Sequence, residues 1–309
     1  MIKWTAWPLM IFVLLIAAGC SGDNENKPDN LEENMLPNAR EEQGFSLGFY
    51  DQEMQIEKER TFEIETDDFL RNILFRNKTN MDRSFTLIIF SNGEQKEFIV
   101  NGQREKVYHF DLESQQEANM LVKLVNIEDG FHAVDYIIME NSDIVIDSND
   151  LTVADELSRI FNVRVNLFKD MNSIPTERPS LTQIGEDLTE SRVEGLLINK
   201  HDKLYSALLQ TESKETVVFD LVYGNLGEDH LDFYLVSLID WKQERMNGSL
   251  KIYDDLASQE NKKMKVSVEN PKEGNNLRVI MLTNPFTPLT EESPFTSSPK
   301  ASFKLELTK

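Results

Sequence analysis

The chain has 309 residues, with 32 Lys and Arg against 54 Asp and Glu, so its formal net charge is −22 and we expect no binding to nucleic acid by default. Hydrophobic residues make up 40% of the chain, which is typical of folded domains and excludes disorder throughout. The single cysteine excludes an intramolecular disulfide framework and any metal or iron–sulfur site built from several cysteines.

The first element along the chain is an export signal, residues 1–19. Lys3 is its only charged residue, and the run from Trp7 to Ala18 is apolar apart from Pro8. A membrane-spanning helix needs about 20 apolar residues, whereas the core of a signal peptide needs roughly 7–15. We therefore expect residues 1–19 to be a signal peptide that the mature protein lacks.

A short motif of small residues ends this signal and leads into Cys20, the only cysteine of the chain. The motif resembles the lipobox of bacterial lipoproteins, in which the cysteine receives a diacylglycerol group before signal peptidase II cuts in front of it. Gly19 and Ala18 fit the pattern, whereas Ala17 stands where the family most often has Leu. The resemblance implies lipidation at Cys20, and two or three acyl chains anchor a protein durably. An incidental thiol beside an ordinary signal peptide is the alternative.

Residues 20–43 are predicted to be a flexible acidic tether. Ser21 to Gln43 contains seven acidic residues against Lys27 and Arg40, and no aromatic residue. Too little apolar surface is present to offset the entropy of ordering. A flexible linker of this length spans on the order of 25–30 Å, which would hold the folded part away from the lipid head groups.

Two further stretches, residues 44–170 and 194–309, share landmarks at similar spacing, which predicts two copies of one module. Residues 171–193 contain Pro175 and Pro179 and no aromatic residue, so we interpret them as the linker. Chance alignment is the alternative. The landmarks are Gly44 with Gly195, Asn77 with Asn225, Phe85 with Phe233, Gly102 with Gly248, Gly130 with Gly274, and Asn141 with Asn284.

Within each copy, short runs of β-branched and aromatic residues alternate with Asn, Gly and Asp turns. Seven or eight strands per copy and no long helical period predict an all-β fold of two tandem antiparallel Greek-key sandwiches of immunoglobulin-like type. A jelly roll or an open barrel would give a similar pattern. The expected strands cover residues 85–90, 98–100, 107–110, 120–125, 134–139 and 163–168, and then 217–223, 233–239, 264–268, 277–282 and 302–307.

No pattern of catalytic or metal-ligating residues stands out, so we predict no enzyme activity, no cofactor and no metal site. A nucleophile elbow, a Walker loop and a GxGxxG motif are absent from the sequence. No two histidines have a spacing that suits one metal ion, and the acidic clusters lack the spacing of a calcium loop. The residues considered were His109, His132, His201 and His230 for a transition metal, and Asp67, Asp68, Asp147, Asn149 and Asp150 for calcium.

The loop before the last expected strand contains four prolines between residues 285 and 299, together with Phe286 and Phe295. Proline lowers the ordering cost of a loop, and aromatic residues often anchor a partner. We expect Phe286, Phe295 and Trp241 to be candidate partner-binding residues. Packing of these rings over the open end of the sandwich is the alternative.

Together these features predict a membrane-anchored, extracytoplasmic lipoprotein with a non-catalytic binding, spacer or envelope-assembly role. Its partner would be a protein or a cell-wall component. The chain also loosely resembles uncharacterised surface lipoproteins of Gram-positive bacteria that have immunoglobulin-like modules, which implies a role only for Cys20. The alternative is an envelope hydrolase or carbohydrate-active protein, which would need two carboxylates roughly 5–10 Å apart in a cleft.

Overall fold

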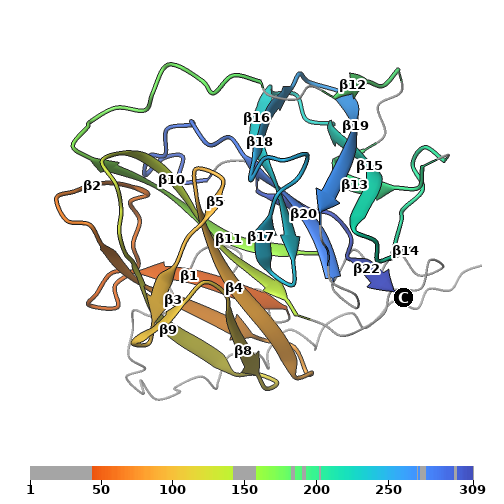
Figure 1. The fold of residues 1–309 in the computed structure, drawn as a ribbon. Helices are drawn as coiled ribbons and strands as arrows, with labels where there is room; N and C mark the ends of the chain where they lie inside the picture. Colours follow the sequence, from red (N-terminus) through yellow and green to blue (C-terminus); the bar gives the residue numbers. More distant parts are fainter. Residues whose placement is uncertain are drawn as a thin grey trace, which may run out of the picture. The chain divides into compact units, whose positions relative to one another are not determined.

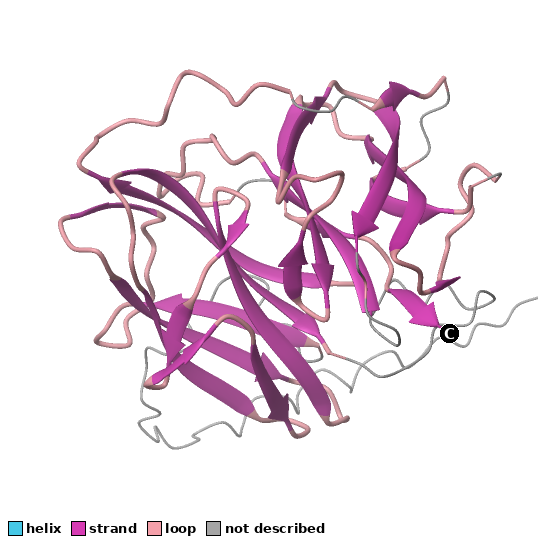
Figure 2. Cartoon of the chain, in the orientation of Figure 1, coloured by secondary structure: helices cyan, strands magenta, loops and turns pink. Residues whose placement is uncertain are grey.

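The computed structural model describes residues 44–141, 158–181, 185–189, 193–201, 203–269, 271, 276–295 and 298–308. Within these ranges every regular element is a β-strand (Figure 1 and Figure 2). They contain no apolar helix of membrane-spanning length. Cys20, Gly274, Asp147, Asn149 and Asp150 lie outside the described residues.

Module 1 is the set of strands from residues 45–169, and module 2 is the set from residues 186–308. The strands of module 1 are β1 (Phe45–Tyr50), β2 (Thr61–Ile64), β3 (Phe69–Asn77), β4 (Arg83–Ser91), β5 (Glu94–Gln95), β6 (Phe98–Val100), β7 (Gln103–Glu105), β8 (Tyr108–Leu112), β9 (Glu117–Leu124), β10 (Gly130–Glu140) and β11 (Ile160–Lys169). The strands of module 2 are β12 (Glu186–Asp187), β13 (Gly195–Asn199), β14 (Gln210–Glu212), β15 (Thr216–Asn225), β16 (Leu231–Ile239), β17 (Lys242–Glu244), β18 (Ile252–Leu256), β19 (Glu260–Glu269), β20 (Asn276–Thr283), β21 (Lys300–Ala301) and β22 (Leu305–Thr308).

Each module is a two-sheet sandwich with the strand order of an immunoglobulin fold. In module 1 the sheets are β1-β3-β9-β6-β7 and β2-β11-β10-β4-β5, with β8 beside β4. In module 2 they are β12-β19-β15-β13 and β14-β22-β20-β16-β17, with β18 beside β16 and β21 beside β20. The predicted pair of tandem Greek-key sandwiches is confirmed. It needs one correction, because β2 pairs with β11, and β14 with β22, in parallel.

A separate apolar core fills the space between the two sheets of each sandwich. Phe75 and Phe85 pack edge to face in module 1, with ring centroids 4.8 Å apart. Tyr223 and Phe233 form the corresponding contact in module 2 at 5.8 Å. All four rings are fully buried, and burying a large apolar side chain contributes about 1.5–3 kcal/mol. Each sandwich therefore has the interior it needs to hold its own sheets together.

The central strands of the two modules correspond residue for residue. Asn141 and Asn284, which follow β10 and β20, donate their backbone N–H to the residue before Phe85 and the residue before Phe233, at 2.8 and 2.6 Å. Counting along the paired strands gives the equivalent positions used below: Phe90 with Leu238, Gln95 with Gln243, Asp135 with Arg278, and Arg164 with Lys304.

The first landmark of the repeat is wrong by two residues. Gly195 faces Gly224 across β13 and β15, whereas Phe45 faces Asn77 across β1 and β3, so Gly44 lies beyond the equivalent position. The outer sheets of the two modules differ in register, so the constant spacing of the other landmarks does not extend to this one.

The range predicted as a linker contributes to module 2. β12 pairs with β19, and Leu188 donates its backbone N–H to the Asn261 carbonyl at 2.8 Å. Gly185 donates to the hydroxyl of Tyr223 at 3.1 Å, and that hydroxyl donates to the buried Asp254 carboxylate at 2.5 Å. Both sandwiches belong to one compact unit.

Candidate functional site

The two sandwiches pack against each other through the outer faces of their central sheets. We call these surfaces the paired faces: in module 1 the outward side chains of β4, β10 and β11, and in module 2 those of β16, β18 and β20. Their apolar side chains form one buried cluster, a third core that neither module contains alone. Its members are Ile88, Phe90, Phe131, Ala133, Ile137, Met139 and Phe168 of module 1, and Tyr234, Val236, Leu238, Tyr253, Ile280, Leu282 and Phe286 of module 2.

A reciprocal pair of glutamines lies at the edge of the paired faces. The backbone N–H of Gln95 donates to Gln243 Oε1 at 2.7 Å, and the backbone N–H of Gln243 donates to Gln95 Oε1 at 2.8 Å. Their Nε2 groups donate to the carbonyls of Trp241 and Gly93, both at 2.8 Å. Trp241 and Gly93 are themselves equivalent, so every bond has a symmetric counterpart. The two modules are therefore related locally by a two-fold axis.

At one end of the paired faces, Arg164 of β11 holds the loop that follows β20. Its side chain is only 4% exposed. The guanidinium donates to the carbonyls of Thr283, Asn284 and Pro285, and to Asn166 Oδ1 at 3.2 Å. Three backbone carbonyls of module 2 are thus satisfied by one side chain of module 1.

Two further hydrogen bonds continue along the same loop. Asn166 donates to the Thr287 carbonyl at 3.0 Å, and the Thr61 hydroxyl donates to the Leu289 carbonyl at 2.8 Å. The first part of the loop is thereby fixed to β11 and β2.

Phe286 belongs to the same loop and is 7% exposed. Its ring packs near Phe131 and Tyr253 at centroid distances of 6.1 and 6.0 Å, and the Arg178 guanidinium lies 4.6 Å from it. The expectation that Phe286 meets an outside partner is corrected, because the ring anchors one module on the other.

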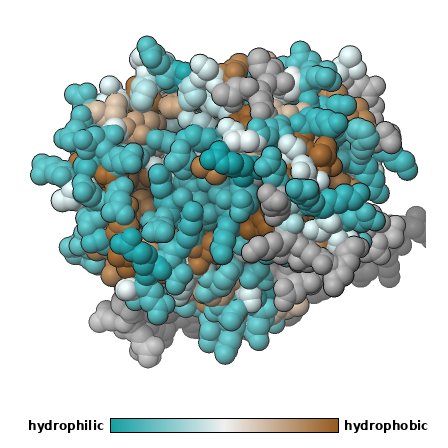
Figure 3. Space-filling view, in the orientation of Figure 1, coloured by the Kyte–Doolittle hydropathy of each residue, from teal (hydrophilic) through white to brown (hydrophobic). Residues whose placement is uncertain are grey.

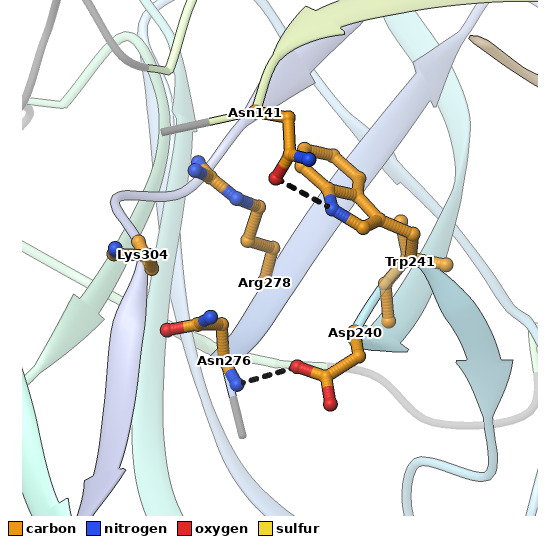
Figure 4. Close-up of a pocket in the computed structure, with 7 residues that line it drawn as sticks. Asn141, Asp240, Trp241, Asn276, Arg278 and Lys304 are labelled. Carbon is orange, nitrogen blue, oxygen red and sulfur yellow. Dashed lines mark hydrogen bonds between the residues drawn. The ribbon is translucent and has the colours of Figure 1, made fainter. Parts of the chain in front are cut away.

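At the other end of the paired faces, Trp241 and two cations surround a small cavity of about 20 Å³ (Figure 4). The indole N–H donates to Asn141 Oδ1 at 3.3 Å, and the Arg278 guanidinium lies 5.3 Å from the indole ring. Lys304 completes this side, and both cations are buried. Burial lowers the pKa of Arg278 to about 10, so it remains charged at neutral pH. A cavity of this size has room for about one water molecule.

The backbone at Trp241 shows why this residue has no aromatic counterpart in module 1. Asp240 and Trp241 have φ values of 45° and 69°, and the equivalent Asn92 and Gly93 have 49° and 78°. Both pairs form the type I′ turn of a two-residue hairpin, which normally selects Gly at the second position. Trp241 accepts left-handed backbone strain while its ring contacts module 1. It is an internal contact of half-buried character rather than an exposed anchor.

Charged groups on the paired face of module 1 are balanced. Asp135 of β10 is buried and faces Arg164 of β11 in the strand register. Burial raises the pKa of Asp135 to about 6, while the Arg164 guanidinium acts in the opposite direction. The equivalent positions in module 2 hold two cations, Arg278 and Lys304.

The remaining predicted residues are dispersed. Phe295 is 58% exposed and keeps its expected role as a prediction. Asp67 and Asp68 form ion pairs with Lys169 and Lys123, and the described residues contain no group of three or more metal-ligating side chains. The four histidines lie apart: His109 contacts Thr86 and His132 contacts Ser91, while His201 and His230 lie near Asp220 and Asp255.

A second, open hollow of about 300 Å³ lies beside module 2, lined by Pro179, Ser180, Arg245, Ser249, Leu250, Lys251 and Tyr253. Neither hollow has two carboxylates among its lining residues. The face shown in Figure 3 is mainly hydrophilic, with apolar side chains in small separate groups.

The sequence reading missed the paired faces, although a signal was present. A strand with one face in solvent alternates apolar and polar residues, whereas a strand buried on both faces reads as a continuous apolar run. Leu87 to Phe90, Tyr136 to Met139 and Val279 to Leu282 are such runs, and all their side chains are buried. They marked the strands that are covered on both sides.

Comparison with known proteins gives no family. No family model matches the chain, and no curated protein matches it. Similar solved structures include red sea bream transglutaminase, with 9% identity over 88% of this chain and 32% of that one at a TM-score of 0.23. They also include a Salmonella enterica SafA pilin in complex with the SafB chaperone (11% identity, 84% of this chain, 96% of that one, TM-score 0.24) and the E. coli chaperone DraB (12%, 86%, 97%, 0.24). The chain thus spans about a third of the transglutaminase. At these scores the matches support no functional argument, and the fold assignment rests on the strand order.

Proposed function

We propose that the protein is a lipoprotein anchored through Cys20 on the extracytoplasmic face of the cell membrane, and that its paired sandwiches form a rigid, non-catalytic body that binds an envelope protein. The export signal, the lipobox-like motif and the acidic tether support the anchor. The duplicated sandwich, joined by a third apolar core, supports the rigid body.

The observation that carries the binding role is the loop after β20, whose first part is fixed on module 1 and which presents the exposed ring of Phe295 further along. Arg164, Asn166 and Thr61 hold its first part on module 1. Thr290 and Ser293 then close a turn, with Ser293 N–H donating to Thr290 Oγ1 at 3.0 Å. A loop already ordered loses little entropy on binding.

The exposed part of this loop defines the chemistry of the partner. Phe295 is exposed, and so are Glu291 and Glu292, which stand shortly before it in the sequence. An aromatic ring flanked by carboxylates fits an apolar pocket bordered by basic residues, since such anchors dominate interface energetics and rim charges steer association. We propose a protein surface of that kind as the partner.

Metabolic labelling tests the anchor. The full chain, expressed in a bacterial host, is expected to incorporate labelled palmitate and to sediment with membranes. Cys20→Ala should abolish the label, and the matched control Ser21→Ala should retain it. Equal labelling of the Cys20→Ala chain would disprove lipidation at this residue.

Cross-linking in intact cells tests the binding role. The anchored chain should be captured together with a partner protein, and Phe295→Ala should reduce that capture about tenfold or more, as expected for an interface anchor. Met81→Ala removes an equally exposed apolar side chain, 57% exposed, from module 1 and serves as the matched control. Equal loss in both variants, or in neither, would exclude Phe295 as the anchor.

A further inference from the structure

The paired faces have the geometry of an interface between two copies of one protein. Gln95 and Gln243 occupy equivalent positions and exchange the same hydrogen bonds in both directions. Phe90 and Leu238, also equivalent, lie in the same apolar cluster. A contact in which equivalent residues meet around a two-fold axis is the arrangement found in symmetric dimers.

The charged groups at equivalent positions differ between the two modules. Module 1 has a carboxylate and a guanidinium at 135 and 164, and module 2 has Arg278 and Lys304 at the equivalent places, all four buried. Asp232 of module 2 also acts electrostatically on Arg164 of module 1. Contact between unlike modules therefore brings an acidic group of module 2 to a cation of module 1, which favours that pairing.

The hydrogen bonds described above across the paired faces are made by the modules themselves and not by residues 171–181, which connect them. Within the described part of residues 171–181, the side chains that pack on the apolar cluster are Met171 and Ile174, and Arg178 lies on Phe286. The glutamine exchange, the Arg164 bonds and the Trp241 bonds are made by the modules themselves. The same contacts can form between modules of different chains.

We propose that the paired faces also join two copies of this chain, with module 1 of one copy packing on module 2 of the other. The resulting dimer has two interfaces, each identical to the intramolecular one. Such an exchange adds no new surface, and it is favoured where copies are concentrated. It depends on the paired faces alone and is independent of lipidation and of Phe295.

Site-directed cross-linking tests the exchange. The full chain carrying Cys20→Ser is kept in detergent, and two forms with different tags are co-expressed, one with Gln95→Cys and one with Gln243→Cys. A bismaleimide reagent should join the two forms to each other. Cross-links between two Gln243→Cys chains should be about tenfold fewer, because the exchange brings position 243 of one copy to position 95 of the other.

The same form with both substitutions in one chain is the positive control, since its two thiols meet within the monomer. Light scattering on wild-type chain with Cys20→Ser should show a dimer beside the monomer. If the two forms yield no mixed cross-link and the chain is monomeric at every concentration, the exchange is disproved. Mixed and Gln243–Gln243 cross-links in equal amounts would disprove the pairing of module 1 with module 2.

Discussion

Polar side chains hold the two modules together at both ends of the paired faces, but the groups involved differ. At one end a single guanidinium, that of Arg164, binds backbone carbonyls of module 2. At the other end the equivalent Lys304 shares its place with Arg278 and an indole that contacts Asn141. Four pairs of equivalent apolar residues lie in the centre between them: Ile88 with Val236, Phe90 with Leu238, Ile137 with Ile280, and Met139 with Leu282. These apolar pairs are thus common to both modules, whereas the polar groups at the two ends differ.

Removing the Arg164 guanidinium should have the largest effect on this comparison. Arg164→Ala leaves three carbonyls of module 2 without their donor and removes the guanidinium that opposes the rise in the pKa of Asp135. A buried acceptor left without its donor costs about 1–3 kcal/mol, so the variant should lose about 3 kcal/mol or more, which urea unfolding would measure. Arg104, on an exposed pair with Glu97, is the control, and its Ala variant should lose less than about 1 kcal/mol. Equal losses would show that Arg164 does not hold the two modules together.

The stability of the protein should depend on pH through Asp135, at the Arg164 end of the paired faces. The folded pKa of Asp135, about 6, exceeds its ordinary value of 3.8, so the folded state binds the proton more tightly than the unfolded state. This contribution to stability is therefore present at low pH and is lost as pH rises through 6. Between pH 7 and pH 4 the wild type should gain about 2–3 kcal/mol relative to Asp135→Asn. Parallel curves for the two chains in urea unfolding would contradict the assignment.

The glutamine pair offers a symmetric test. Gln95→Ala and Gln243→Ala each leave one part-buried backbone N–H without its acceptor, which should cost about 1–3 kcal/mol. Because the bonds are reciprocal, the two losses should agree within about 0.5 kcal/mol, and a double-mutant cycle should show coupling. Clearly unequal losses would break the local two-fold relation.

The smallest expected effect concerns the two hairpin turns. Trp241→Gly relieves left-handed backbone strain of about 1 kcal/mol but loses the contacts of the indole ring. Because the two effects oppose each other, the free energy of unfolding should change by less than about 1 kcal/mol. Gly93→Ala should lower the stability more, because a Cβ there would lie 2.9 Å from Tyr234 Cγ and the φ of +78° suits glycine. Thermal unfolding of both variants measures the difference. A larger loss for Trp241→Gly would mean that its ring contributes more than the strain costs.

The sequence predicted the strands that pack as regular apolar runs and missed those interrupted by polar residues. Residues 98–100 match β6 at both ends, and β10 contains the expected 134–139. β3 was missed because Arg71, Asn72 and Arg76 break its apolar pattern; Asn72 instead donates to the Asp51 carbonyl at 2.7 Å.

The site was less accessible to sequence reasoning than the fold. The sequence marks Phe286 and Trp241 as candidate contact residues, but composition cannot tell an outside partner from a neighbouring module. That distinction depends on contacts separated by more than a hundred residues, such as Arg164 with Thr283. Cys20 and the loop acids at 147–150 lie outside the described residues, so their roles stay predictions.

The attachment of the loop after β20 to β2 and β11 has a mechanical consequence. A pull on Leu289 or Thr287 is passed directly to Thr61 and Asn166 of module 1. Those two residues face each other in the parallel pairing of β2 with β11. Tension on the loop therefore reaches module 1 without travelling through residues 171–193, and the load is shared by both sandwiches.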